Sequence, residues 1–463
     1  MQETNKPQKP FIGRQLELEK LTQIYQTDNF EFGVVYGRRR IGKSTLLKSF
    51  IKDKPSIYLV ANEKKLEFNL ENFAREVGAF VGQTHIKFSS FSDMLDFLFT
   101  NISEKTIIII DEFTYLVETE KAVLSELQNA VDKYKDNSRL KLIISGSHVG
   151  MVEDMIAYKK PLYARKTFAI KLGEFDYFEA AEFFPNFSPE DRIRAYSFCG
   201  GVPYYLSLVD DTKSIRENII DMFVRPFAHL ENELDFIFQT EFRSKVNYSS
   251  VLQVVANGKT KLNEISQISH INDTAKTATY LKPLIDMGIV QKERAFADSQ
   301  QTRKTIYKLK NNLVNFMYSF LEDNKSAHGL LSPQDFYEII IEPKLDQYVS
   351  FIFEEVCKQY LIRTNKMPGS EKILEIGRYW YNCRHTKSQI EIDICTKTTK
   401  GVIAYECKWT NSQIDMAIML GLWDKAQAVD EISICEIGAF SKSGFTPGVT
   451  EKYKRIFTPK DLF

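Results

Sequence analysis

The chain has 463 residues, of which 43% are hydrophobic, with 61 Lys and Arg balanced by 61 Asp and Glu. This length predicts about three domains, and the apolar content excludes a disordered chain. The balanced charge leaves any preference for nucleic acid to local patches. Six scattered cysteines without a CxxC pair, and first residues without an apolar signal segment, favour a cytoplasmic protein with reduced thiols. No apolar run reaches the roughly 20 residues that span a bilayer, so no membrane partner is expected.

Between residues 32 and 172, short apolar segments alternate with amphipathic ones, a pattern typical of a parallel sheet covered by helices. The expected strands are Phe32–Tyr36, Ser56–Val60, Thr106–Ile110, Leu140–Ile144 and Thr167–Leu172. The expected helices include Ser44–Ile51, Phe68–Phe80 and Ala122–Tyr134. Strand patterns then cease, and the segment from Glu174 to Phe242 is predicted to be helical.

The segment Gly37-Arg38-Arg39-Arg40-Ile41-Gly42-Lys43-Ser44 matches the phosphate-binding pattern G-x-x-x-x-G-K-[ST] between an expected strand and an expected helix. Glycines let backbone N–H groups face phosphate oxygens, and the positive end of the helix points at them. Lys43 is predicted to reach the β- and γ-phosphates and Ser44 to bind Mg²⁺; the alternative is a chance match in a turn. The predicted nucleotide contacts from this loop are Gly37, Arg38, Arg40, Ile41, Gly42, Lys43, Ser44 and Thr45.

An acidic pair, Asp111 and Glu112, follows the apolar strand Ile107–Ile110. Asp111 is predicted to bind in the Mg²⁺ shell, and Glu112 to polarise the attacking water. A carboxylate at the position of Glu112 can also be a switch element. Taken alone, the pair could be the solvated end of a buried strand.

These motifs resemble the AAA-like ATPases of the STAND group, often called archaeal ATPases. Four further stretches are similar to the pattern of that family, namely Phe11–Glu17, Ile144–Ser147, Pro161–Arg165 (with Ala164 in place of the usual glycine) and Gly200–Pro203. The resemblance covers roughly residues 10–320 and implies ATP as the nucleotide. It also implies that Arg14 and Pro203 flank the base and that Arg165 contacts the γ-phosphate, in cis or from a neighbouring subunit of a homo-oligomer. A surface arginine is the alternative for Arg165.

Residues 248–310 contain ten Lys or Arg and five Asp or Glu, a local basic excess. Short helices, with Thr274–Met287 as the second of the motif, precede Gly288–Val290 and Thr305–Leu309, an order that suggests a winged helix-turn-helix. Basic and polar residues on that helix and beside the wing predict contact with DNA phosphates. They are Lys276, Thr277, Thr279, Lys292, Arg294, Arg303 and Lys304. The alternative is a switch module that packs on the nucleotide lid and touches no DNA.

A second charged group lies on two expected strands near the end of the sequence, Ser388–Ile394 and Gly401–Trp409. Residues two apart in a strand share a face, so Glu406 and Lys408 point the same way and Asp393 can face them. Two carboxylates and a lysine suit metal-assisted phosphodiester hydrolysis. Asp393 and Glu406 would bind Mg²⁺ or Mn²⁺, and Lys408 would orient the attacking water or help to deprotonate it.

This second group resembles the PD-(D/E)xK nuclease fold, although no proline precedes Asp393. The twelve residues between Asp393 and Glu406 suit a hairpin. The resemblance implies a further glutamate on an upstream helix, for which Glu354 is the candidate. An archaeal-type ATPase with a C-terminal nuclease-like domain of undefined role resembles a recurring two-part architecture.

Together these patterns predict a multidomain α/β protein. The expected parts are a P-loop ATPase core (1–173), a helical lid (174–245), a winged helix (246–311), a connecting helix or linker (312–332) and a nuclease-like domain of the restriction-endonuclease type (333–463). The leading hypothesis is an ATP-dependent switch or motor coupled to a metal-dependent nuclease that acts on DNA, in defence or DNA processing. The alternatives are a signalling ATPase whose C-terminal domain binds a partner without cutting, and a DNA-binding regulator that uses only the winged helix.

Overall fold

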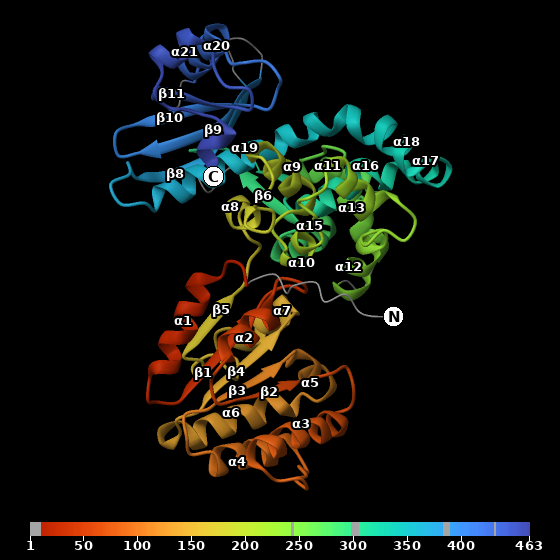
Figure 1. The fold of residues 1–463 in the computed structure, drawn as a ribbon, viewed down its shortest axis with the longest axis vertical. Helices are drawn as coiled ribbons and strands as arrows, with labels where there is room; N and C mark the ends of the chain where they lie inside the picture. The colour runs from red at the N-terminus through yellow and green to blue at the C-terminus, as the bar shows by residue number, and fades with distance from the viewer. Residues whose placement is uncertain (1–10, 242–244, 298–304, 383–388, 430–431) are drawn as a thin grey trace. The chain divides into compact units, whose positions relative to one another are not determined.

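The computed structural model describes residues 11–241, 245–297, 305–382, 389–429 and 432–463. The first ten residues, Phe242, Arg303, Lys304 and Ser388 lie outside this range, so the predictions made for them are not addressed below. The chain divides into two compact units (Figure 1), one of residues up to Glu174 with Val202–Tyr204, the other of Phe175–Gly201 with Tyr205–Phe463. Within the described ranges no helix is long and apolar enough to cross a membrane.

The first unit is built on a sheet of five parallel strands in the order β2-β3-β4-β1-β5. Its strands are β1 (Glu31–Tyr36), β2 (Ser56–Val60), β3 (Ile107–Asp111), β4 (Lys141–Gly146) and β5 (Phe168–Lys171). The predicted strands agree with these to within a residue or two at each end. Every residue of β3 and β4 is buried, because helices cover both faces of the sheet.

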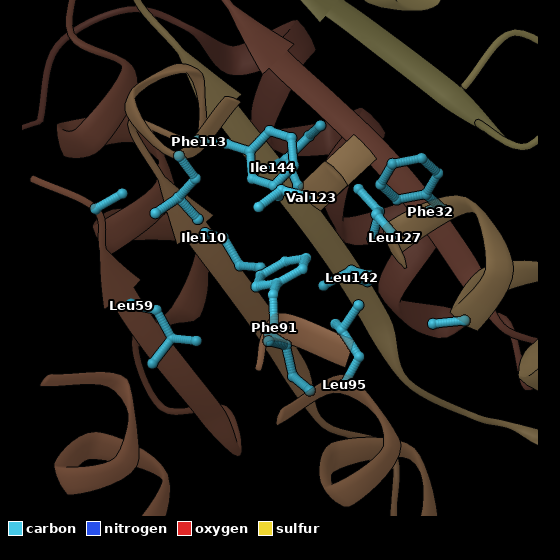
Figure 2. Close-up of a cluster of buried hydrophobic side chains, with 14 of the residues drawn as sticks. Phe32, Leu59, Phe91, Leu95, Ile110, Phe113, Val123, Leu127, Leu142 and Ile144 are labelled. Atoms are coloured by element: carbon cyan, nitrogen blue, oxygen red, sulfur yellow. The ribbon is translucent and has the colours of Figure 1, made fainter. Parts of the chain in front are cut away.

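Helices on the two faces of this sheet form two apolar cores. Helices α3 (Leu66–Val81), α4 (Phe91–Asn101) and α6 (Ala122–Tyr134) lie on one face, where Phe32, Ile110 and Leu142 pack against Phe91 and Leu127 (Figure 2). Strand residues alternate between faces, so Val35 and Ile109 point the other way. There they pack with α2 (Lys43–Ile51), beside α1 (Gln15–Gln26). The remaining short helices of this unit are α5 (Thr114–Thr119), η1 (Lys135–Asn137) and α7 (Val149–Ile156).

Helices dominate the second unit up to residue 365. Its first helices are α8 (Tyr177–Ala181), α9 (Pro189–Cys199), α10 (Pro203–Ser207, which begins in the first unit), α11 (Ile215–Ile219), η2 (Ile220–Val224) and α12 (Glu233–Glu241). Helices α13 (Lys245–Ala256), α14 (Leu262–Ile268) and α15 (Thr274–Asp286) are followed by an antiparallel ribbon of β6 (Val290–Arg294) and β7 (Thr305–Leu309). Three helices and a two-stranded ribbon thus occur in the predicted order, while the winged-helix fold and its DNA-binding role stay predictions.

After the ribbon come α16 (Asn312–Phe320), η3 (Glu322–Asn324), α17 (Lys325–Leu330), α18 (Pro333–Phe336), η4 (Tyr337–Ile341) and α19 (Glu342–Asn365). A mixed sheet then follows, with strands in the order β12-β11-β10-β9-β8. Its strands are β8 (Ile373–Asn382), β9 (Gln389–Thr398), β10 (Val402–Lys408), β11 (Ile434–Ser441) and β12 (Ile456–Phe457). β8, β9 and β10 pair antiparallel, whereas β10, β11 and β12 pair parallel. The other helices here are α20 (Met416–Gln427), α21 (Pro447–Lys452) and η5 (Pro459–Leu462).

The 24-residue helix α19 belongs to two packed regions at once. On one side the Tyr348 hydroxyl lies 2.8 Å from the carbonyl of Ser197, which is on α9, and 3.0 Å from that of Asn312 on α16. On the other side, Phe353 packs on Trp409, with ring centroids 5.0 Å apart. The predicted boundary at residue 333 therefore precedes a helix that is shared with the preceding helices.

The β6–β7 ribbon is also fixed to the second sheet. Phe296, just after β6, is 4% exposed and lies in the same apolar cluster as Tyr379 and Ile392. Its N–H donates to the carbonyl of Arg378 at 2.8 Å, and the N–H of Ala297 donates to Glu375 at 3.0 Å. The end of the ribbon is thus held against the edge strand β8.

Candidate functional site

The predicted phosphate loop lies between the end of β1 and the start of α2, with Ser44 and Thr45 in the first turn of that helix. Arg40 and Gly42 have positive φ angles of 66° and 90°, which turn the backbone. At Gly37 a Cβ atom would lie 2.6 Å from the carbonyl oxygen of Leu172, so only glycine fits there. The loop geometry therefore depends on the two glycines that the motif requires.

The ammonium of Lys43 lies inside this loop. Its Nζ atom donates to the carbonyls of Gly37 at 3.0 Å and Arg38 at 3.3 Å, and to the Ser147 hydroxyl at 2.8 Å. Lys43 is 5% exposed. The charge is thus positioned where the motif places it, among the backbone groups that would face phosphate oxygens.

Asp111, at the end of β3, accepts three side-chain hydrogen bonds. Ser44 Oγ donates to Asp111 Oδ2 at 2.7 Å, the Tyr58 hydroxyl donates to the same oxygen at 2.5 Å, and Ser145 donates to Oδ1. Burial and the neighbouring Asp111 charge raise the pKa of Tyr58, so it stays a donor. The predicted Mg²⁺ residues, Ser44 and Asp111, are therefore in direct contact. Mg²⁺ commonly uses one or two protein ligands with water completing the shell, and this pair fits that pattern.

Glu112 has a left-handed backbone with φ of 55°, unusual for a residue other than glycine. Its carboxylate accepts hydrogen bonds from the Ser147 N–H at 3.2 Å and the Ser147 hydroxyl at 2.5 Å. It lies 4.0 Å from Lys43 Nζ. Ser147 thus joins the acidic pair to the loop lysine. This arrangement suits both predicted roles of Glu112, water activation and switching.

Arg14 and Pro203 both lie beside the loop. The buried Arg14 guanidinium donates to the carbonyls of Ile41 at 3.3 Å and Gly173 at 2.5 Å, and it pairs with Glu17 at 3.3 Å. It therefore holds loop backbone, and its predicted role beside the base stays a prediction. A Cβ on Gly42 would lie 3.7 Å from Pro203 Cγ.

Two further arginines have partners that the motifs did not indicate. The Arg40 guanidinium lies 4.4 Å from the ring centroid of Tyr204, which follows Pro203. Arg165 forms a bidentate ion pair with Asp132 of α6, with the shortest contact at 2.6 Å. Its γ-phosphate contact stays a prediction. That contact would require the guanidinium to leave this ion pair.

The predicted carboxylate group of the second unit lies at the middle of β9 and the end of β10. Tyr405 pairs with Ile394, so Asp393 and Glu406 come next along the two strands. The N–H of Cys407 donates to Asp393 Oδ2 at 2.9 Å. Glu406, 6% exposed, pairs with Lys408 at 2.5 Å and with Lys425 of α20 at 3.5 Å.

Glu354 of α19 approaches this group from the helix side. Burial and then the Asp393 charge raise its pKa to about 7, with Arg378 opposing the shift from 3.2 Å away. Burial and the Glu406 charge likewise raise the pKa of Asp393. Burial disfavours the charged form of Lys408, but its hydrogen bond to Glu406 and the negative charges of Glu406 and Asp393 together outweigh this and raise its pKa. The structure therefore brings together the predicted residues Glu354, Asp393, Glu406 and Lys408.

Sequence reasoning missed Arg378, Tyr58 and Lys425. Arg378 also pairs with Glu391 at 2.9 Å, so it bridges α19 and β9 from strand β8. No group of three or more His, Cys, Asp or Glu able to hold a metal occurs in the described ranges. A metal at the second unit would therefore have only the pair Asp393 and Glu406, which suffices for Mg²⁺ with bound water.

Two segments of the chain match described protein families. Residues 11–209 match a family described as an ATPase domain predominantly from Archaea. Residues 317–418, which include all four residues of the carboxylate group, match a family described as archaeal and bacterial proteins of unknown function. The chain is 32% identical over 407 residues to the uncharacterized protein MJECL04 of Methanocaldococcus jannaschii, covering 86% of this chain and 87% of that one. The chain belongs to the same family as this archaeal protein.

The first unit of this family member is thus a P-loop ATPase domain, and the predicted resemblance to archaeal ATPases is confirmed at that level. Membership of this family implies ATP as the nucleotide. A segment of 44 residues is 39% identical to the uncharacterized ATP-binding protein MJ0423 of the same organism, covering 10% of this chain and 75% of that one.

Two solved structures are similar to this ATPase at low identity. The Walker-type ATPase PABY2304 of Pyrococcus abyssi has a TM-score of 0.48 and 18% identity, covering 66% of this chain and 96% of that one. The ORC2 protein of Aeropyrum pernix has a TM-score of 0.48 and 14% identity, covering 71% and 98%.

Proposed function

We propose that this ATPase couples ATP binding and hydrolysis to a metal-dependent nuclease-like domain that acts on DNA. The observation that carries the proposal is the convergence of the buried Glu406 with the half-buried Glu354, Asp393 and Lys408. Carboxylates whose pKa values are raised by burial and by mutual repulsion destabilise the fold, so their convergence favours a chemical role.

In the ATPase half, Lys43 contacts the β- and γ-phosphates, Ser44 and Asp111 bind Mg²⁺, and Glu112 activates water. Arg14 and Pro203 are assigned to the base side of the nucleotide, and Arg165 to the γ-phosphate, from the same or a neighbouring subunit. The predicted STAND classification, lid and winged helix are parts of the same proposal.

In the second unit, Asp393 and Glu406 would hold Mg²⁺ or Mn²⁺. When bound, the metal supplies Lewis acidity to the phosphodiester and to water. Because its raised pKa keeps Lys408 protonated, the ammonium orients the attacking water instead of accepting its proton. Glu354, with a pKa of about 7, can accept a proton near neutral pH.

A second candidate is a nucleotide-controlled signalling ATPase whose C-terminal domain binds a partner or DNA without cutting. Protein cations already neutralise the carboxylates: Lys408 and Lys425 pair with Glu406, and Arg378 pairs with Glu354. A domain balanced in this way needs no metal for stability, which favours this alternative.

The deciding experiment measures cutting of plasmid and single-stranded DNA with Mn²⁺, with and without ATP. Wild type is compared with Asp393→Ala and Lys408→Ala, and with the exposed neighbours Asp424→Ala and Lys400→Ala as matched controls. Loss of cutting in the first pair alone supports the proposal, whereas equal cutting by all five proteins would show contamination and remove the nuclease assignment.

Lys43→Ala tests the coupling in the same assay. Loss of an ATP effect in this variant supports a link between the two units. A cutting rate that changes neither with ATP nor with Lys43→Ala would mean that the ATPase and the nuclease activities are not coupled.

A further inference from the structure

The second unit contains a cavity of about 430 Å³ that ends at the carboxylate group. Helices α13, α16 and α19, the β7 strand and the β8–β9 edge line it. Glu354, Arg378 and Asp393 are among its lining residues, whereas Glu406 and Lys408 are not. The cavity thus reaches Asp393 from the helix side, and Glu406 lies beyond it.

One face of α19 lines this cavity, and its residues become more buried along the helix toward Glu354. Lys344, Gln347 and Phe351 are exposed, whereas Glu354 and Lys358 are half-buried, and all five line the cavity at helical spacing. Phe351 is 59% exposed, which is unusual for a phenylalanine in the wall of a cavity. Within the described ranges no aromatic ring packs on it, so its exposed face is accessible to a stacking ligand.

The charges on the wall complement a nucleic-acid backbone. Lys344 of α19 and Lys310, just after β7, form no ion pair with any residue in the described ranges, although both line the cavity. By contrast, Lys308 pairs with Glu293 at 3.2 Å and Lys358 with Glu355 at 3.8 Å. Lys344 and Lys310 thus line the same cavity as the exposed ring of Phe351. Cations together with an aromatic ring are the combination with which proteins bind single strands, because phosphates contact the cations and a base stacks on the ring.

An exposed ring in this cavity selects unpaired strands, because the bases of a double helix are already paired and stacked on one another and cannot stack on a side chain. The ribbon walls the cavity, and its end is held by the burial of Phe296 against β8. The cavity volume falls within the range of small-ligand sites, roughly 300 to 1,000 Å³, so a single nucleotide fits in it.

We infer that this cavity binds a single-stranded segment of nucleic acid, with a base stacked on Phe351 and the chain directed toward Asp393. The inference rests on the proposed function for the class of ligand, and it narrows that class to unpaired strands. From Phe351 to Glu354 the helix rises about 4.5 Å, so the stacked base lies close to the carboxylate group.

The test measures binding, so it does not depend on cutting. A fluorescently labelled oligothymidylate and a blunt duplex of equal length are titrated with the full chain in Ca²⁺, and anisotropy is recorded. Wild type is expected to bind the single strand at least tenfold more tightly than the duplex. Phe351→Ala is expected to weaken single-strand binding roughly tenfold, the loss of one stacked base. The matched control is Phe68→Ala, an exposed phenylalanine of the first unit at 55%, which retains the affinity.

Equal affinity for duplex and single strand, no binding by wild type, or unchanged affinity in Phe351→Ala overturns the inference. The inference and the proposed function fail separately. Binding that depends on Phe351 without any cutting supports the cavity and removes the nuclease. DNA cutting that depends on Asp393 but not on Phe351 supports the proposed nuclease activity. It also shows that the substrate does not bind through the cavity.

Discussion

Glu354→Gln is expected to change how the stability of the second unit depends on pH. The carboxyl group has its pKa raised from 4.5 to about 7 by burial and by Asp393, so the folded state retains its proton to higher pH than the unfolded state does. As pH rises from about 4.5 to 7, the unfolded state releases this proton first, and wild type loses stability. The loss of stability is complete above the pKa of Glu354 in the folded state and absent below its pKa in the unfolded state.

The magnitude follows from the shift. At 1.36 kcal/mol for each pKa unit, the cost of the charged form reaches about 3 kcal/mol at pH 8 as an upper bound. The Glu354 side chain is 22% exposed, so solvent screens only part of this interaction. Glutamine mimics the protonated acid, so the variant should match wild type near pH 4.5 and exceed it by up to about 3 kcal/mol at pH 8.

Urea unfolding followed by tryptophan fluorescence measures this difference at pH 5, 6, 7 and 8. All three tryptophans, Trp380, Trp409 and Trp423, lie in the second unit, so the signal reports on that unit. Glu355→Gln on the same helix controls for removing any carboxylate there. A constant difference between wild type and Glu354→Gln at every pH would refute the reasoning, because it would mean that Glu354 acts only as the ion-pair partner of Arg378.

Three further predictions test other contacts. Tyr58→Phe removes a hydrogen bond to the Asp111 carboxylate and should destabilise the first unit by about 1 to 3 kcal/mol in thermal unfolding; unchanged stability would mean that this contact contributes nothing. Arg165→Ala should slow ATP hydrolysis at least tenfold with ATP affinity retained, while Asp132→Ala, which removes only its partner, should keep the rate. Equal rates of ATP hydrolysis in both variants would mean that Arg165 serves only to pair with Asp132. Phe296→Ala should cost about 3 to 5 kcal/mol in tryptophan-detected unfolding, and a cost under about 1 kcal/mol would show that the ribbon is not held there.

The sequence predicted the first sheet well because its strands are buried on both faces and therefore appear as uninterrupted apolar runs. The phosphate loop was equally accessible, since its spacing is set by backbone geometry within one short segment, and Asp111 was accessible because it ends an apolar strand. The contact of Tyr58 with Asp111 was not, because it depends on β2 lying next to β3, and alternation along one strand does not identify its neighbour.

The second unit shows the same limit more strongly. Alternation placed Glu406 and Lys408 on one face, and the resemblance to the nuclease fold implied Glu354 on an upstream helix, so the group was predicted in outline. Arg378 escaped because β8 is an edge strand, and its pairing with β9 joins segments that no local pattern links. Burial of Phe296 in a core formed about eighty residues later is likewise a long-range event that periodicity cannot reveal.

The shared helix α19 has a consequence for how such proteins are put together. A fragment that starts at residue 333 would keep α19 but lose α9 and α16, leaving the Tyr348 hydroxyl without its two carbonyl partners and an aromatic face exposed to water. Such a fragment is expected to aggregate when expressed alone. The C-terminal sheet is therefore no interchangeable module: a gene fusion could transfer it to another ATPase only together with the helices on which α19 rests.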